Sequence, residues 1–213
     1  MMSETLESTA LAPINQAFGA VAPIEAYPDR AEPHMEPYLE RHLERAQLVE
    51  RLGFNALWLR DVPFNALSFG DAGQLFDPFV YLGLLAATTE RIALGVSSSI
   101  LPLRHPAHVA KAAASVDVLS GGRLLLGVAS GDRPEEYPAM NVDFDRRSEL
   151  FRESFEYIRQ MSAEAPRFEN AFGAPGGGRD LPPKPTGGRL PMLITGGARQ
   201  SPDWAAAHGD GWM

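Results

Sequence analysis

The stretch RIALGVSSSILPLRHPAHVAKAAASVDVLSGGRLLLGVASGD, residues 91–132, decides the fold of this chain. Its two apolar runs, 92–96 and 124–129, lack polar alternation, which is typical of strands buried on both faces of a parallel sheet. Between them, apolar residues at helical spacing predict a helix that begins at Pro106, where no amide donor is needed, and ends at the glycine pair 121–122. The stretch therefore predicts a strand–helix–strand unit with a right-handed crossover.

Small hydroxyl residues follow both predicted strands. Ser97, Ser98 and Ser99 come after the first strand, and Ser130 and Gly131 come after the second. In parallel α/β proteins, ligands bind beyond the carboxyl ends of the strands. These residues indicate either a ligand site at that edge or hydroxyl groups that only satisfy loop backbone, and spacing alone does not separate the two.

The rest of the chain continues the alternation of strands and helices. Further strands are predicted over 15–24, 54–59 and 191–195, and further helices over 37–52, 77–90, 146–163 and 201–208. Asp77-Pro78 is a strong helix start, and Asp143 or Asp145 is the expected cap of the helix that follows a polar loop at 132–144. The glycine- and proline-rich segment 164–190 predicts an irregular loop, either a lid or disordered.

Composition restricts the class of protein. The chain has 213 residues, 45% hydrophobic and 22% charged, which suits one globular domain. Its net charge of −8 argues against nucleic acid and anionic membranes as partners. Without cysteine there are no disulfides, thiolate nucleophiles or cysteine–zinc sites. No signal peptide or membrane helix is evident, so we expect a cytoplasmic protein.

A glycine-rich turn after the strand at 191–195 is the best candidate anion site. Glycine lets the backbone approach a phosphate, and amide groups at a helix start attract negative charge. The same turn also suits an ordinary strand–helix connection. The candidate residues are Thr195, Gly196, Gly197, Ala198, Arg199 and Ser201, with Arg147 at another helix start as a weaker candidate.

Two other sets of polar side chains have residue types that can carry chemistry: Asp61, and the histidines His105 and His108. Asp61, at the carboxyl end of the strand at 54–59, is either a catalytic base, a substrate contact, or a loop carboxylate paired with Arg60. His105 and His108 lie three residues apart without a third ligand at suitable spacing, so we predict no metal site.

Two segments, LPLRHPAHVAKAAASVDVLSGGRLLLGVASG and PMLITGGARQSPDWAAAHGDGW, resemble the luciferase-like monooxygenase family. The resemblance implies a (β/α)8 barrel, a flavin whose phosphate lies at 195–201, and a non-prolyl cis peptide between Ser97 and Ser98 beneath the flavin ring. It also implies a homodimer through the helices at 77–90 and 106–119. Asp61 stands where bacterial luciferase has an essential histidine, which speaks against light-emitting aldehyde chemistry.

Length qualifies the predicted fold. A typical (β/α)8 barrel has roughly 250 residues, whereas this chain stops at residues that resemble the start of a sixth strand. We therefore predict an α/β fold of the (β/α)8 TIM-barrel type that is incomplete after about strand six. Residues 1–13 are expected to form a flexible tail, and residues 14–213 a single barrel domain in which 164–190 is a lid-like loop.

The resemblance implies a flavin-dependent monooxygenase that uses reduced FMN, supplied by a separate reductase, and oxygen to oxidise a small organic substrate. Several alternatives stay open. One is an F420-dependent enzyme that transfers hydride without oxygen, and another is a shortened flavin-binding protein without catalysis. The others are a fragment that depends on a partner and a flavin-free barrel enzyme, such as a lyase that uses Asp61.

Overall fold

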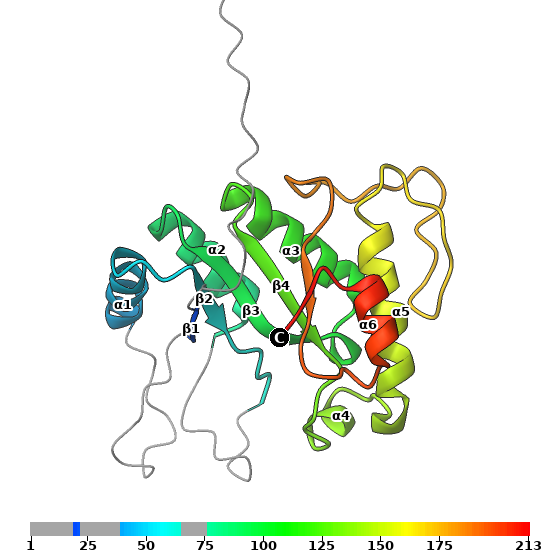
Figure 1. The fold of residues 1–213 in the computed structure, drawn as a ribbon. Helices are drawn as coiled ribbons and strands as arrows, with labels where there is room; N and C mark the ends of the chain where they lie inside the picture. Colours follow the sequence, from blue (N-terminus) through cyan, green and yellow to red (C-terminus); the bar gives the residue numbers. More distant parts are fainter. Residues whose placement is uncertain (1–18, 22–38, 65–75) are drawn as a thin grey trace, which may run out of the picture.

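The computed structural model describes residues 19–21, 39–64 and 76–213, and it shows a curled half-barrel of six parallel strands. Strand order follows the chain from β1 to β6, so each strand pairs with its sequence neighbours. In Figure 1 the sheet extends from β1, beside α1, through β4 toward α5 and α6. This confirms a (β/α)8-type fold that is incomplete after strand six. The strands are β1 (Gly19–Val21), β2 (Ala56–Leu59), β3 (Ala93–Ile100), β4 (Leu124–Ala129), β5 (Met192–Ile194) and β6 (Gly211–Trp212).

Helices connect the strands largely where the sequence predicts them. The helix over 106–119 has the predicted bounds, and Asp77 caps α2 by accepting hydrogen bonds from the amides of Phe79 and Val80. None of the described helices is long and apolar enough to cross a membrane. The helices are α1 (Leu39–Arg51), α2 (Pro78–Thr88), α3 (Pro106–Leu119), α4 (Glu136–Ala139), α5 (Arg147–Gln160) and α6 (Pro202–His208), with 3-10 helices η3 (Leu101–Leu103) and η4 (Phe144–Arg146).

Three predictions are wrong: the end of a strand, the absence of helix from a loop, and the residue that caps a helix. The strand expected to end at Val96 continues to Ile100, because its pairing with β4 resumes at Ser99 after a register shift. The expected loop at 132–144 contains α4 and the start of η4. Asp143 caps η4 and not α5, whose N-cap Arg146 makes no side-chain capping bond.

Some predictions lie outside the described residues or stay untested. The tail at 1–13 and most of the predicted first strand, apart from Gly19–Val21, are outside them. The segment 164–190 contains one isolated bridge, Asn170–Gly173, and packs on the helices, where the Thr186 amide donates to Asp117. Its role as a lid stays a prediction.

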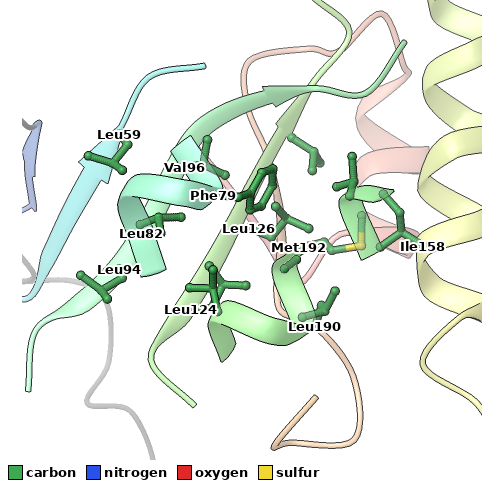
Figure 2. Close-up of a cluster of buried hydrophobic side chains, with 14 of the residues drawn as sticks. Leu59, Phe79, Leu82, Leu94, Val96, Leu124, Leu126, Ile158, Leu190 and Met192 are labelled. Atoms are coloured by element: carbon green, nitrogen blue, oxygen red, sulfur yellow. The ribbon is translucent and has the colours of Figure 1, made fainter. Parts of the chain in front are cut away.

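The core lies between the strands and the helices that cover them. Leu94, Val96, Leu124, Leu126 and Met192 are at most 1% exposed, as expected for strands buried on both faces. Figure 2 shows these side chains in one cluster with Phe79 and Leu82 of α2, and with Ile158 of α5 next to Met192. Burying this apolar surface is the main favourable contribution to folding.

Two side chains tie the layers together through backbone groups. Arg123, after α3, donates to the carbonyl oxygens of Ala86, Thr89, Ile92 and Ser120 and to the Thr89 hydroxyl, at distances of 2.7–3.0 Å. Glu50 of α1 accepts three amide hydrogen bonds on one oxygen, from residues 90–92, at 2.7–2.9 Å. α1, the α2–β3 connection and β4 are thereby held in one arrangement.

Glu50 gives the fold an acid-sensitive contact. Burial raises the pKa of Glu50, but the three amide bonds and the charge of Arg91 together hold it below 4.5. A carboxylate with a lower pKa in the folded state stabilises it fully above its unfolded pKa, and the contribution disappears as pH falls through the folded pKa. We expect Glu50→Gln to be less stable than wild type at pH 7, with the gap narrowing below pH ~4. Urea midpoints at both pH values measure this.

The control for this variant is Glu156→Gln, at an exposed position of α5. Its stability is expected to track wild type at both pH values, because exposed side chains away from specific contacts contribute little. A gap between Glu50→Gln and wild type that keeps its size from pH 7 to acid would contradict the assignment.

Candidate functional site

A bulge in β3 carries the first predicted cofactor residues. The peptide bond between Ser97 and Ser98 is cis, as predicted, and both serines are half-buried. The pairing register with β4 shifts between Val96 and Ser99. Here the Val96 carbonyl oxygen lies so close to β4 that a Cβ atom added to Gly127 would be 2.2 Å from it. The bulge therefore sits against a backbone that only glycine allows.

Asp61 lies beside this bulge in a network of ion pairs. Its carboxylate accepts two hydrogen bonds from Arg104, from Nε at 2.9 Å and Nη2 at 2.8 Å, and a third from the Ser99 hydroxyl at 3.3 Å. Nη2 of Arg104 also donates to Asp77 at 2.8 Å. Burial lowers the pKa of Arg104, but the hydrogen bonds and charges of Asp61 and Asp77 outweigh this and raise it. Asp61 thus forms a bidentate ion pair with Arg104, and not with Arg60, the partner named in one of the alternatives weighed for it.

This network forms one wall of a cavity of about 390 Å³. The cavity opens beyond the ends of β2 and β3, since Asp61 lies just after β2 and Ile100 is the last residue of β3. Apart from Asp61, Asp77 and Arg104, its lining is apolar: Val62, Pro63, Phe76, Pro78, Ile100, Leu103 and Met140. Its size suits a small organic molecule.

The end of β4 is closed off by Tyr137. Its hydroxyl donates to the carbonyl of Ser130, and burial raises the pKa of Tyr137 to about 12. Gly131 has φ +77, and an added Cβ would lie 2.8 Å from both Ile100 and the Tyr137 hydroxyl oxygen. Ser130 is 5% exposed. Contact of Ser130 and Gly131 with a flavin stays a prediction.

The turn after β5 presents backbone donors. Gly196, Ala198 and Arg199 have φ of 57, 42 and 58°, in the left-handed region that non-glycine residues seldom adopt. Within the described ranges, the amides of Gly197, Ala198 and Arg199 donate no hydrogen bond. Consecutive free amides in such a turn form a concave anion site. A Cβ added at Gly197 meets no atom within 4 Å, so the turn has open space beside it.

The flanking hydroxyls suit a phosphate group as well. The Ser201 hydroxyl accepts the Trp204 amide at 3.2 Å as the N-cap of α6, and its own proton stays available as a donor. Thr195 Oγ1 is buried and has no hydrogen-bond partner among the described residues. An unpaired buried hydroxyl beside free amides and Arg199 fits a phosphate monoester.

Both parts of the site lie on the same edge of the sheet. Ser99 pairs with Val128 across β3 and β4, and Val128 pairs with Ile194 across β4 and β5. The β3 bulge and the Thr195 turn are therefore two strand spacings apart, or about 10 Å. One elongated ligand can reach from the serines to the turn.

Arg147 makes its contacts elsewhere. Its Cζ lies 3.6 Å from the Phe144 ring centroid, and Nη1 donates to the Phe144 carbonyl at 2.6 Å. Ser148, the next residue, contacts the turn after β5: its hydroxyl donates to the Arg199 carbonyl oxygen at 2.9 Å. Phosphate contact by Arg147 stays a prediction, while Ser148 supports the shape of the turn.

Sequence reasoning identified Asp61 and Asp77 but missed Arg104 and its ion pairs with both carboxylates. One signal was available: Arg104 is a cation in the mostly apolar segment 101–106, between two elements predicted to be buried. A cation so placed needs a counter-ion. Its partner Asp61 is 43 residues away in the sequence, so only the fold identifies the pair.

Comparisons with known proteins agree with this geometry. A family model described as luciferase-like monooxygenase matches residues 17–213. An uncharacterized Mycobacterium tuberculosis protein, Rv0940c, is 30% identical over 192 residues, or 81% of this chain and 64% of its own length. This chain therefore spans less than two thirds of that relative.

Two solved structures have the same fold. An F420-dependent secondary alcohol dehydrogenase in complex with an F420-acetone adduct matches with a TM-score of 0.74 at 20% identity, over 92% of this chain and 57% of that one. The oxygenating constituent of Pseudomonas putida 3,6-diketocamphane monooxygenase, in complex with FMN, matches with a TM-score of 0.65 at 16% identity, over 84% and 51%.

Proposed function

This chain belongs to the luciferase-like monooxygenase family, and from that premise we propose that it is a flavin-dependent oxidoreductase. In this proposal it uses reduced FMN and oxygen to oxidise a small organic substrate. The observation that carries the proposal is the turn after β5, where the amides of Gly197, Ala198 and Arg199 donate no hydrogen bond within the described part of the chain. Such a donor set matches the phosphate end of FMN.

In this proposal the predicted site residues would line the cofactor from its phosphate to its ring. Thr195, Gly196, Ser201 and the free amides would hold the phosphate, and Ser97 and Ser98 would lie under the ring, with Ser130 and Gly131 beside it. Bound reduced flavin would supply the electrons that activate oxygen. The chain would orient the ring against the cavity of about 390 Å³, and the apolar residues of its lining would limit access of water to the reacting atoms.

A charge placed at the turn tests the proposal. Gly197→Asp puts a carboxylate where the phosphate would bind, and the open space there means the side chain fits without disturbing the fold. We expect the Kd for FMN to rise at least about 10-fold, through repulsion between like charges. Flavin fluorescence titration of the purified protein measures it.

The matched control is Gly176→Asp, which adds the same charge in the segment 164–190, where an added Cβ also meets nothing within 4 Å. It is expected to bind FMN like wild type. Equal FMN affinity in Gly197→Asp and wild type would remove the phosphate assignment, and no FMN binding by wild type would count against the function itself.

The same donors would also hold the phosphate of F420, so an F420-dependent enzyme that transfers hydride is the second candidate function. The fold shared with the F420-dependent alcohol dehydrogenase supports it to the same degree. Titration with each cofactor separates the two, and oxygen uptake with reduced FMN separates an enzyme from a flavin carrier.

Two exposed apolar side chains, one on α2 and one on α3, bear on the assembly of the protein. We propose a homodimer through α2 and α3, supported by the exposed apolar side chains Val80, at 74%, and Leu119, at 69%. A separate reductase as the source of reduced flavin and a cytoplasmic location stay predictions from the sequence.

A further inference from the structure

We propose that Arg104 is a substrate-binding residue of the 390 Å³ cavity, and that it selects apolar molecules carrying one neutral oxygen acceptor, such as a ketone, over carboxylates. Asp61 is then a positioning residue that holds Arg104 and does not remove a proton. The inference rests on the proposed function only in taking the cavity as the substrate side of the site.

The guanidinium is fixed before any ligand arrives. Nε and Nη2 of Arg104 make two parallel hydrogen bonds to Asp61, whose side chain is 2% exposed. Ser99, fully buried at the end of β3, donates to the same carboxylate. A planar guanidinium held in this bidentate way loses little entropy when it binds a further group.

The remaining nitrogen of Arg104 is available to a ligand. Nη1 carries two N–H groups, and neither donates a hydrogen bond among the described residues. Arg104 lines the cavity, and its side chain is 28% exposed. Arg104 therefore presents Nη1 to the cavity as a charged donor, while its Nε and Nη2 are already bonded to the carboxylates.

The net charge of Arg104, Asp61 and Asp77 disfavours the binding of anions in the cavity. Arg104 contributes one positive charge, and Asp61 and Asp77, both in ion pairs with it, contribute two negative charges. The net charge of the three groups is −1, so a carboxylate in this cavity is repelled. A neutral carbonyl oxygen accepts from Nη1 without that repulsion, and the rest of the lining is apolar. Charge and lining together define the substrate class.

A series of three probes with one carbon skeleton tests this selectivity. Binding of cyclohexanone, methylcyclohexane and cyclohexanecarboxylate to the purified protein is measured by ligand-observed NMR. We expect cyclohexanone to bind about 10-fold more tightly than methylcyclohexane, because it gains a hydrogen bond to a charged donor. Cyclohexanecarboxylate should bind more weakly than cyclohexanone by a similar factor.

Three variants assign the binding to this cavity. Arg104→Lys keeps the charge but loses the fork and Nη1, so the preference for cyclohexanone over methylcyclohexane should fall to within about 2-fold. Met140→Trp fills the cavity from its partly exposed wall and should abolish binding of all three probes. Leu48→Trp, at an exposed position of α1 outside the cavity, should leave binding unchanged.

Three results would overturn the proposal: tighter binding of the carboxylate than of the ketone, an undiminished ketone preference in Arg104→Lys, or unchanged binding to Met140→Trp. If Arg104→Lys does not fold, the wild-type series with Met140→Trp still decides the substrate class. Titration of FMN is read separately, so a chain that binds no flavin refutes the proposed function without affecting the probe result.

Discussion

Gly127→Ala is expected to lower the free energy of unfolding by about 3 kcal/mol or more, the upper part of the range for overpacking. The added Cβ would lie 2.2 Å from the Val96 carbonyl oxygen and 3.5 Å from Thr195 Oγ1. The first neighbour is backbone inside a paired strand, so relief requires β3 and β4 to move apart. Chemical denaturation followed by circular dichroism measures the loss.

The same variant is expected to weaken cofactor binding. Val96 immediately precedes Ser97 and Ser98, so a shift of β3 displaces the bulge that we propose lies under the flavin ring. Gly176→Ala is the control, because a Cβ there meets no atom within 4 Å and Gly176 lies in the segment 164–190. The free energy of unfolding of that variant should stay within about 0.5 kcal/mol of wild type. Wild-type stability of Gly127→Ala would mean that β3 and β4 are farther apart than described.

Arg123→Ala is expected to cost about 3 kcal/mol. The guanidinium donates to four carbonyl oxygens and one hydroxyl, which belong to α2, the α2–β3 connection and the residue after α3, and alanine removes this donor. Each unsatisfied buried polar group costs about 1–3 kcal/mol, and water reaching part of this half-buried site offsets some of the sum. Thermal and urea unfolding measure the loss.

Arg123→Lys should lie between wild type and Arg123→Ala, since one ammonium group cannot reach all five acceptors. Arg91→Ala is the matched control: Arg91 is 71% exposed, and its pair with Glu90 spans 3.8 Å, so a change within about 0.5 kcal/mol is expected. If Arg123→Ala behaves like Arg91→Ala, the carbonyl oxygens around Arg123 are satisfied by water.

The fold was predictable where local rules decide it. The helix over 106–119 has a proline at its start and glycines at its end, and its bounds are as predicted. The end of β3 was not predictable, because serines usually end a strand but here β4 supplies partners beyond the bulge. The helix α4 was missed because its four residues, Glu136–Ala139, are too few to show a helical periodicity that differs from a loop.

The candidate site divides in the same way. The cis peptide between Ser97 and Ser98 was implied by resemblance and is confirmed. Asp61 was chosen for its place at a strand end, but its contacts depend on Arg104, which lies beyond another helix and strand. Pairs formed across 43 residues leave no local pattern, so the cavity and its charge balance emerged only from the fold.

Trp212 and Met213 hold the turn after β5 through two hydrogen bonds to Gly196, and a third bond joins Met213 to Ile194 of β5. The Gly196 amide donates to the Met213 carbonyl at 2.8 Å, the Trp212 indole donates to the Gly196 carbonyl at 2.7 Å, and the Met213 amide donates to Ile194 at 3.0 Å. If an anion bound at the turn stabilises β6 through these bonds, contacts that stabilise β6 will tighten anion binding by the same factor, because the coupling between two sites is reciprocal. Docking of further polypeptide against β6 would then act as an effector of the cofactor site, at a distance and without touching the ligand.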